Sequence, residues 1–265
     1  MNISVVLPIY KKNSLVQIVK VYNSFVNQLF FINELVVIYD GHVNSEIKNF
    51  FSNKKKVVTI TNFKNIGLGL TLRKAILKCK SNIIIRVDAD DVNKHDRFKK
   101  LIKTYINKPT CAVIGSYLIE MHSYKYLYRE LPTSDFLIKL NLNIRNPINH
   151  PTVILNKKII IKSGNYENCP YFEDYLLWLK IKKNNGRFLN LRDFLVSSPI
   201  NSDFYSRRSG VKYFKHYINF IKICYKKKLI NIFFIFISLI LRYCSYSNFK
   251  FLKFFYKQFL RKSYN

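Results

Sequence analysis

In Ile83-Ile84-Ile85-Arg86-Val87-Asp88-Ala89-Asp90-Asp91 an apolar run leads directly into three acids. The apolar run predicts a strand buried on both faces, and three carboxylates follow where that strand leaves the sheet. In sheets that alternate with helices, ligands bind at the carboxyl ends of the strands. An Asp-x-Asp pair also brings two oxygen atoms to one side of an extended chain, which suits a divalent cation such as Mg²⁺ or Mn²⁺. A solvated acidic turn is the alternative.

Strand and helix patterns alternate four times in the first 107 residues. Apolar runs predict strands at 3–7, 35–39 and 57–61 before the Asp-rich strand, with Pro8 ending the first. Residues at helical spacing predict helices between and after them. This alternation predicts a parallel sheet with covering helices.

Three of the predicted strand ends carry polar or conformationally special residues, which would meet at one edge of the sheet. They are Pro8-Ile9-Tyr10, Asp40-Gly41 and Asp88-Ala89-Asp90. Gly67 and Gly69 open the next predicted helix, and such flexible backbone at a helix N-terminus suits an approach to phosphate. The pattern is neither a Rossmann nor a Walker glycine motif.

The second half is less regular. Strands are predicted at 112–119 and 124–131, which could pair antiparallel, followed by a helix at 135–142 and a strand at 152–155. A further helix begins at Glu173-Asp174 and buries Leu177, Trp178 and Ile181. Acids in a first turn are stabilised by the helix dipole, so capping is the alternative to a catalytic role for them.

The charge is strongly basic and uneven. The 265 residues carry a net charge of +30, and from Phe204 onward there are 14 Lys+Arg and no acidic residue. Such a segment needs a polyanion, either nucleic acid or an anionic membrane surface. An apolar run at 229–241 is shorter than the roughly 20 residues that span a bilayer, so it indicates an interfacial segment, and 249–260 repeats the pattern. The alternative is a buried helix of the globular domain.

The cysteines and the N-terminus indicate the compartment. Five cysteines, with no Cys-x-x-Cys, support neither a disulfide framework nor a zinc site, and fit a reducing environment. The start lacks a basic region and a cleavage site, so no signal peptide is expected.

A series of short motifs resembles a known family, in this order: Val-Val-Leu-Pro-Ile-Tyr, Asp-Gly, Asn-x-Gly-x-Gly, Asp-Ala-Asp-Asp, Asn-His-Pro-Thr, Glu-Asp-Tyr-x-Leu-Trp and Tyr-Ser-Arg-Arg-Ser-Gly. Together they resemble glycosyltransferase family 2, inverting enzymes of the GT-A fold, of the amylovoran and O-antigen type, over about residues 3–215. The resemblance implies an α/β protein with a mixed central sheet. A nucleotide-sugar-binding half would cover 1–107, an acceptor-binding half with the catalytic base 108–205, and a basic amphipathic membrane-associating tail 206–265.

The resemblance also assigns roles. Asp174 would be the catalytic base with Glu173 beside it, and Asp90 would hold the divalent cation, Mn²⁺ or Mg²⁺. His150 would stand near the diphosphate or acceptor, and Arg207 and Arg208 would neutralise the leaving diphosphate. The residues implied to bind the nucleotide are Pro8, Tyr10, Asp40, Asn65, Gly67 and Asp88.

Two departures from the family pattern stand beside these roles. Tyr39 replaces the first Asp of the usual Asp-Asp-Gly, although the closer subgroup also lacks it. Arg73 and Ala75 stand where that subgroup usually has Asn and Gly, so Arg73 is assigned no ligand.

By resemblance, the chain would transfer a hexose or N-acetylhexosamine from a UDP-sugar to a polyprenyl-diphosphate-linked saccharide, with inversion, in bacterial surface polysaccharide biosynthesis. It would be cytoplasmic and associate peripherally with the inner face of the cell membrane, with no nucleic-acid partner. The alternative is a basic nucleic-acid- or membrane-binding protein on a non-catalytic scaffold of this type. That alternative accounts for the charge but not for a buried strand that runs into three acids.

Overall fold

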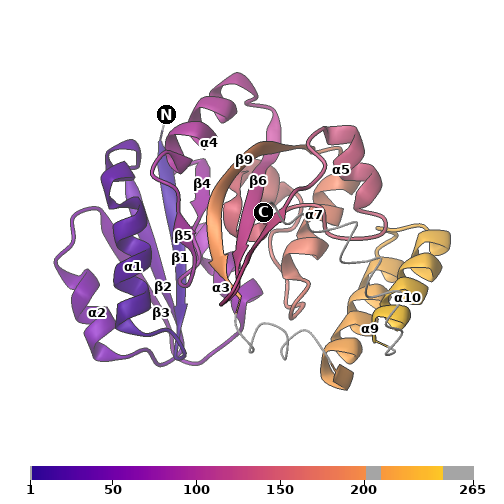
Figure 1. The fold of residues 1–265 in the computed structure, drawn as a ribbon, viewed down its shortest axis with the longest axis horizontal. Coiled ribbons are helices and arrows are strands. Elements are labelled where there is room, and N and C mark those ends of the chain that lie inside the picture. Colours follow the sequence, from indigo (N-terminus) through magenta and orange to yellow (C-terminus); the bar gives the residue numbers. More distant parts are fainter. Residues whose placement is uncertain (1, 201–209, 247–265) are drawn as a thin grey trace.

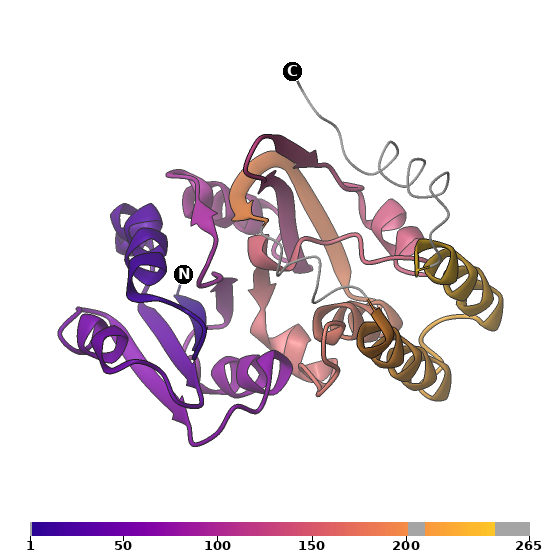
Figure 2. The same cartoon turned by 60° about the horizontal axis from the view of Figure 1, so that its bottom comes forward.

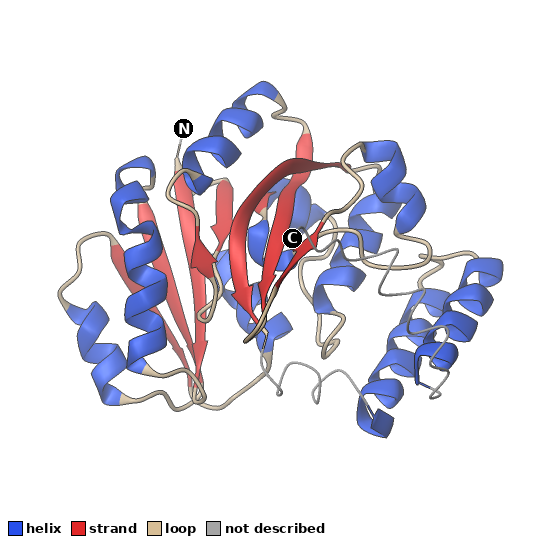
Figure 3. Cartoon of the chain, viewed as in Figure 1, coloured by secondary structure: helices blue, strands red, loops and turns tan. Residues whose placement is uncertain are grey.

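One mixed sheet organises the computed structural model, which describes residues 2–200 and 210–246. Nine strands form it, in the order β3-β2-β1-β4-β8-β6-β9-β5, with β7 paired to β6. Helices cover both faces of this sheet (Figure 3), so the core consists of two apolar layers, one on each face.

The first half is the predicted parallel sheet. β1 (Ile3–Tyr10), β2 (Glu34–Asp40), β3 (Val57–Asn62) and β4 (Ile83–Arg86) pair in parallel. Residues from α1 (Leu15–Phe25), α2 (Ser45–Ser52) and α4 (Arg97–Asn107) share one apolar layer, and those from α3 (Leu68–Lys78) lie in the other. A 3-10 helix, η1 (Val26–Phe31), follows α1.

Pro8 does not end the first strand, contrary to the sequence prediction. β1 continues to Tyr10, and its pairing with β2 continues to the same residue. The Val6 carbonyl accepts a hydrogen bond from the Val87 N–H, so alternate residues of β1 face β4. Pro8 lies two residues after Val6, so its backbone also faces β4, which ends at Arg86. Its missing N–H therefore falls where the pairing with β4 stops, and the pairing with β2 on the other side continues.

The second half closes the sheet with mixed pairing. β6 (Cys111–Met121) and β7 (Tyr126–Arg129) are antiparallel, as the sequence suggests. β8 (Ile154–Asn156) pairs antiparallel with both β4 and β6 and so joins the two halves. β9 (Arg187–Pro199) and β5 (Val92–Asn93) were not predicted. The register of β9 against β6 shifts at three places, which breaks the alternation by which a strand is recognised in sequence.

The remaining elements lie between these strands or after them. α5 (Asp135–Asn141) and α7 (Glu173–Lys183) are the predicted helices, while α6 (Lys157–Lys162) and the 3-10 helix η2 (His150–Thr152) were not predicted. α9 (Gly210–Lys226) and α10 (Ile232–Tyr246) follow, and they lie side by side at the end of the molecule away from α1 and α2 (Figures 1 and 2).

The two C-terminal helices pack against the same core as α7. Tyr217, Phe220 and Cys224 of α9 are buried, as is Ile235 of α10. No helix among the described residues has both the length and the apolar content needed to cross a membrane. Arg207, Arg208 and the predicted repeat at 249–260 lie outside the described residues.

Candidate active site

The end of β2 anchors the glycine-containing turn that precedes α3. Oδ1 of Asp40 accepts hydrogen bonds from the Asn62 side chain (3.2 Å) and the Ile66 N–H (2.9 Å), and Oδ2 accepts from the Gly67 N–H (3.1 Å). Asn65 donates to the Asp40 carbonyl at 3.4 Å. Three of the predicted nucleotide residues, Asp40, Asn65 and Gly67, therefore lie together, and the carboxylate of Asp40 fixes the turn.

Pro8 and Tyr10 stand at the end of the neighbouring strand. Pro8 is paired with Ile38 and Tyr10 with Asp40 in the β1–β2 register. The half-buried Tyr10 is held by a hydrogen bond from its N–H to Asn13 Oδ1 at 2.9 Å. The carboxyl ends of β1 and β2 thus form one edge with the turn before α3, as predicted for a nucleotide site.

The three acids after β4 form a compact group. One carboxylate oxygen from each of Asp88, Asp90 and Asp91 lies within 4.8 Å of the others. Asp90 is exposed, Asp88 is half-buried and Asp91 is buried. Burial raises the pKa of both Asp88 and Asp91, and the neighbouring carboxylates raise it further. Hard oxygen ligands at this spacing fit a divalent cation, which would relieve that repulsion.

Two buried arginines support this acidic group, and sequence reasoning missed both. Arg86 forms an ion pair of 2.6 Å with Asp88. Arg97 donates to the carbonyls of Arg86 (2.6 Å) and Pro151 (2.7 Å) and to Asn93, so it ties the end of β4 to η2. Burial lowers the pKa of Arg97 to about 9. An arginine within an apolar strand, as at Arg86, was the available signal.

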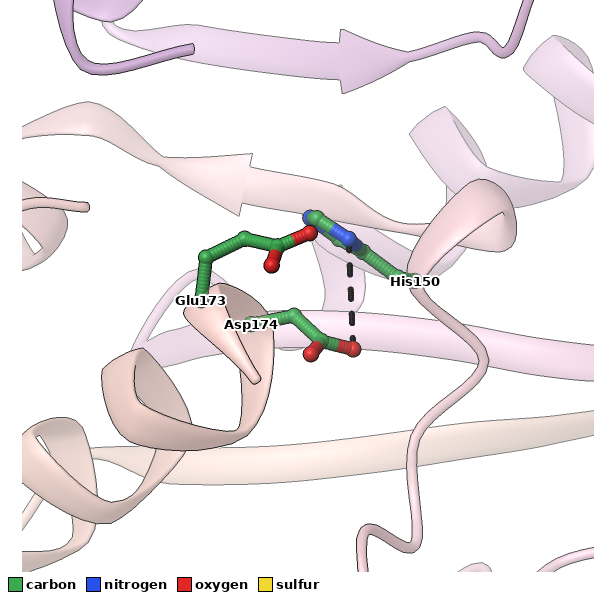
Figure 4. A group of neighbouring side chains, drawn as sticks. All are labelled: His150, Glu173 and Asp174. Atoms are coloured by element: carbon green, nitrogen blue, oxygen red, sulfur yellow. Dashed lines mark ion pairs between the residues drawn. The ribbon is translucent and has the colours of Figure 1, made fainter. Parts of the chain in front are cut away.

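A second group lies at the start of α7, where Glu173 and Asp174 face His150 of η2 (Figure 4). Asp174 Oδ2 accepts from Asn146 Nδ2 at 2.7 Å and lies 3.9 Å from His150 Nδ1. Its Oδ1 accepts from the Tyr175 N–H at 2.7 Å. The carboxylate is therefore oriented by two donors from different segments.

The protonation of this group follows from its surroundings. His150 Nε2 lies 2.7 Å from the Tyr166 hydroxyl, and burial lowers the pKa of His150 well below its ordinary value, so its imidazole is neutral. Burial raises the pKa of Asp174, opposed by the Tyr175 N–H, the Asn146 amide and the charge of Arg86. Although the three side chains are close enough to ligate a metal, both oxygens of Asp174 already accept hydrogen bonds. The arrangement therefore suits a proton acceptor better.

The N-terminus of α3 lies directly against the start of α7. A Cβ on Gly69 would stand 2.4 Å from the Glu167 carbonyl oxygen and 3.0 Å from Cβ of Glu173. Only glycine allows this approach. Gly69 thus sets the spacing between the turn anchored by Asp40 and the helix that carries Asp174.

The structure brings most of the predicted residues into three groups: the edge formed by β1, β2 and the turn before α3; the acids after β4; and the His150–Glu173–Asp174 group. Asn146 and Tyr166, which orient the last group, were not predicted. An isolated Asn or Tyr in a loop carries no sequence signal for this role. The role of each residue remains a prediction.

Comparison with known proteins identifies the class. Residues 4–164 match Glycosyl transferase family 2. The chain is 31% identical over 216 residues to the amylovoran biosynthesis glycosyltransferase AmsE of Erwinia amylovora, covering 80% of this chain and 81% of that protein. It is 30% identical over 216 residues to the UDP-Gal:alpha-D-GlcNAc-diphosphoundecaprenol beta-1,3-galactosyltransferase of Escherichia coli, covering 79% and 78%.

Solved structures agree on the fold. The structure of S. aureus TarS 1-349 in complex with UDP-GlcNAc matches with a TM-score of 0.62 at 19% identity, covering 82% of this chain and 64% of that one. The predicted GT-A fold is thereby confirmed. The protein is a glycosyltransferase enzyme, as predicted. The chain belongs to glycosyl transferase family 2.

Proposed function

We propose that this enzyme transfers a hexose or N-acetylhexosamine from a UDP-sugar to a hydroxyl of a polyprenyl-diphosphate-linked saccharide, with inversion, in bacterial surface polysaccharide biosynthesis. The observation that carries the proposal is the separation of two acidic groups, one after β4 and one at the start of α7. Donor and acceptor chemistry need different acids at different places. The similarity to the galactosyltransferase of Escherichia coli, whose name gives a UDP-sugar and a lipid-diphosphate acceptor, supports the choice of substrates.

In this proposal Asp174 is the base. The acceptor hydroxyl oxygen bonds to the anomeric carbon of the donor sugar as the bond from that carbon to the diphosphate oxygen breaks. The hydroxyl proton goes to Asp174, and the electron pair of the broken bond leaves with UDP. A carboxylate suffices because the hydroxyl becomes acidic as the anomeric carbon becomes oxocarbenium-like, by analogy with glycoside hydrolysis. Asn146 and the Tyr175 N–H hold its oxygens in place.

The acids after β4 serve the donor. Asp90 would hold the Mn²⁺ or Mg²⁺ ion, because it is exposed while Asp91 is buried and Asp88 is engaged by Arg86. A bound divalent cation supplies Lewis-acid stabilisation of the leaving diphosphate. Asp40 and Gly67 would present the turn before α3 to the nucleotide, and Arg207 and Arg208 would neutralise the diphosphate, as the family resemblance implies.

A surface on α10 suits contact with a membrane. Its exposed side chains include Ile232, Phe233, Phe236, Ile240 and Leu241. Lys226 to Lys228 precede this helix, and no acidic residue follows Phe204. Apolar exposure beside basic residues is what an anionic bilayer surface attracts. We propose that this face rests on the cytoplasmic leaflet of the cell membrane and brings the enzyme to its acceptor.

The enzymatic proposal is tested by a screen of nucleotide sugars with Mn²⁺ or Mg²⁺, reading released UDP with and without a lipid-diphosphate saccharide acceptor. The expected result is metal-dependent UDP release from one UDP-sugar that rises sharply when acceptor is present. If no UDP-sugar supports transfer while another nucleotide sugar does, the donor assignment is wrong.

The membrane proposal is tested by sedimentation with vesicles that contain anionic lipid. The double variant Phe233→Ser/Phe236→Ser should lose most of its vesicle binding, because each substitution removes an exposed aromatic ring from this surface. The matched control Val16→Ser/Phe30→Ser changes residues that are as exposed on other elements, and it should bind as the wild type does. Equal binding by both double variants would contradict the assignment.

A further inference from the structure

Arg86 is a buried cation that interacts with both acidic groups of the site. Its exposed fraction is 3%, although it occupies the last position of a strand whose other residues are isoleucines. Ile84 lies in the apolar layer shared with α3 and α7, whereas Ile83 and Ile85 lie in the opposite layer. Because side chains alternate along a strand, Arg86 points to the same face as Ile84, toward the start of α7.

The contacts of Arg86 do not account for the cost of burying it. Its Nη2 forms the 2.6 Å ion pair with Asp88. Within residues 2–200 and 210–246, its Nε and Nη1 are buried and have no hydrogen-bond acceptor. A buried charge with unsatisfied donors is destabilising, and an isoleucine at this position would continue the strand. The arginine is therefore better explained by function than by stability.

The charges around Arg86 show what it serves. Burial acts to lower its pKa, but the carboxylates of Asp88, Glu173 and Asp174 and the Tyr166 hydroxyl raise it overall. Arg86 therefore interacts electrostatically with acids of both groups: Asp88 after β4, and Glu173 and Asp174 at the start of α7. It also contributes to the low pKa of His150.

Several polar groups surround the carboxylate of Asp174 itself. Asn146 and the Tyr175 N–H donate to it, and His150 is neutral beside it. Glu173 precedes it on α7, and the Tyr166 hydroxyl lies 2.7 Å from His150 Nε2. Among the residues that the structure describes, Arg86 and Arg129 of β7 are cations that stabilise the ionised form of Asp174.

We propose, on the basis of the function proposed above, that Arg86 is a positioning residue that serves both halves of the reaction: it holds Asp88 in place for the donor, and it stabilises the carboxylate form of Asp174 for the acceptor. Since its nitrogens are buried, it acts through these carboxylates and does not touch the substrate. Coulomb interactions are stronger away from water, so burial strengthens the effect of the Arg86 charge on these carboxylates.

The test follows the carboxyl titration of Asp174 by ¹³C NMR in the full chain without substrate, with the Asp174→Asn variant assigning the signal. In Arg86→Met the titration midpoint should move to higher pH by on the order of one unit, because a nearby cation favours the charged carboxylate. Arg86→Lys should restore the midpoint most of the way. Arg192→Met, which removes an exposed arginine of β9, should leave it unchanged.

A second readout tests the link to catalysis. In Arg86→Met the acidic limb of the kcat profile should shift to higher pH together with the NMR midpoint. An unchanged midpoint in a folded Arg86→Met variant overturns the proposal. If that variant does not fold, Arg86→Gln replaces it, and a wild-type midpoint there has the same meaning. The NMR titration needs no substrate, so it decides the role of Arg86 even if the proposed transfer reaction is wrong.

Discussion

Replacing Gly69 with alanine tests whether the spacing between the donor half and the catalytic helix sets the rate. The new Cβ would lie 2.4 Å from the Glu167 carbonyl oxygen. An ordinary carbon–oxygen contact is about 3.3 Å, so the alanine Cβ and the Glu167 carbonyl oxygen would be about 0.9 Å too close. The atom it meets belongs to the backbone, so no side-chain rotation relieves the clash. The start of α3 or the segment before α7 has to move by nearly that amount.

A shift of this size at Asp174, the proposed base, should lower the rate of transfer. Cβ of Glu173, next to Asp174, lies 3.0 Å from the new methyl group, so the displacement reaches the proposed catalytic carboxylate. A misplacement of about 1 Å can cost on the order of 10²-fold in rate, and kcat of Gly69→Ala should fall by about this factor. Overpacking should also cost about 1–3 kcal/mol of stability. The measurements are kcat at saturating donor and a thermal unfolding curve.

Gly210 supplies the control for backbone strain alone. It lies at the start of α9 with φ +78, and no atom of the described residues lies within 4 Å of a Cβ built on it. Gly210→Ala should lose about 1 kcal/mol of stability from the left-handed conformation and keep its kcat. The reasoning is refuted if Gly69→Ala keeps wild-type kcat, or if both variants lose kcat to the same extent.

Three further predictions concern the metal, the pH profile and the core. Asp90→Ala should abolish the tightening of UDP binding by Mn²⁺ in isothermal titration calorimetry; persistent tightening would reassign the metal. Because burial raises the pKa of Asp174 and a base must be ionised, kcat should fall on the acidic side with a midpoint above the ordinary Asp value of about 3.9; a midpoint at or below it would count against this base. Ile84→Ala, at a fully buried position, should lower the free energy of unfolding in urea by about 2–5 kcal/mol. Ile106→Ala, at an exposed position, should change it by no more than about 0.5 kcal/mol. Equal losses of stability in the two variants would contradict the burial of Ile84.

The parallel half of the fold was predictable because its strands are short segments rich in apolar and β-branched residues between turn signals. The course of β1 was not, because the effect of Pro8 depends on where the neighbouring strand ends. β9 also escaped prediction, because register shifts against β6 break its alternation. Propensity is local, whereas these features are set by the partner strand.

Some residues of the candidate site were also predictable from sequence, and others were not. Asp88, Asp90 and Asp174 stand in recognisable motifs, so sequence could propose them. Asn146 and Arg86 act through contacts to distant segments, and only the fold shows those contacts. The C-terminal segment is an intermediate case: its basic and apolar pattern was visible in the sequence, but the packing of α9 on the core beside α7 was not.

The proposed division of labour gives the proton of the acceptor hydroxyl to Asp174 and the nucleotide to the acids after β4. Single-turnover transfer by Asp174→Asn, with the dissociation constant of UDP measured on the same preparation in the presence of Mn²⁺, tests it most directly. Asparagine keeps the shape of the side chain but cannot take the proton. The account predicts that transfer is abolished while UDP binds nearly as tightly as in the wild type. Transfer at the wild-type rate, or loss of UDP binding in step with activity, would contradict it.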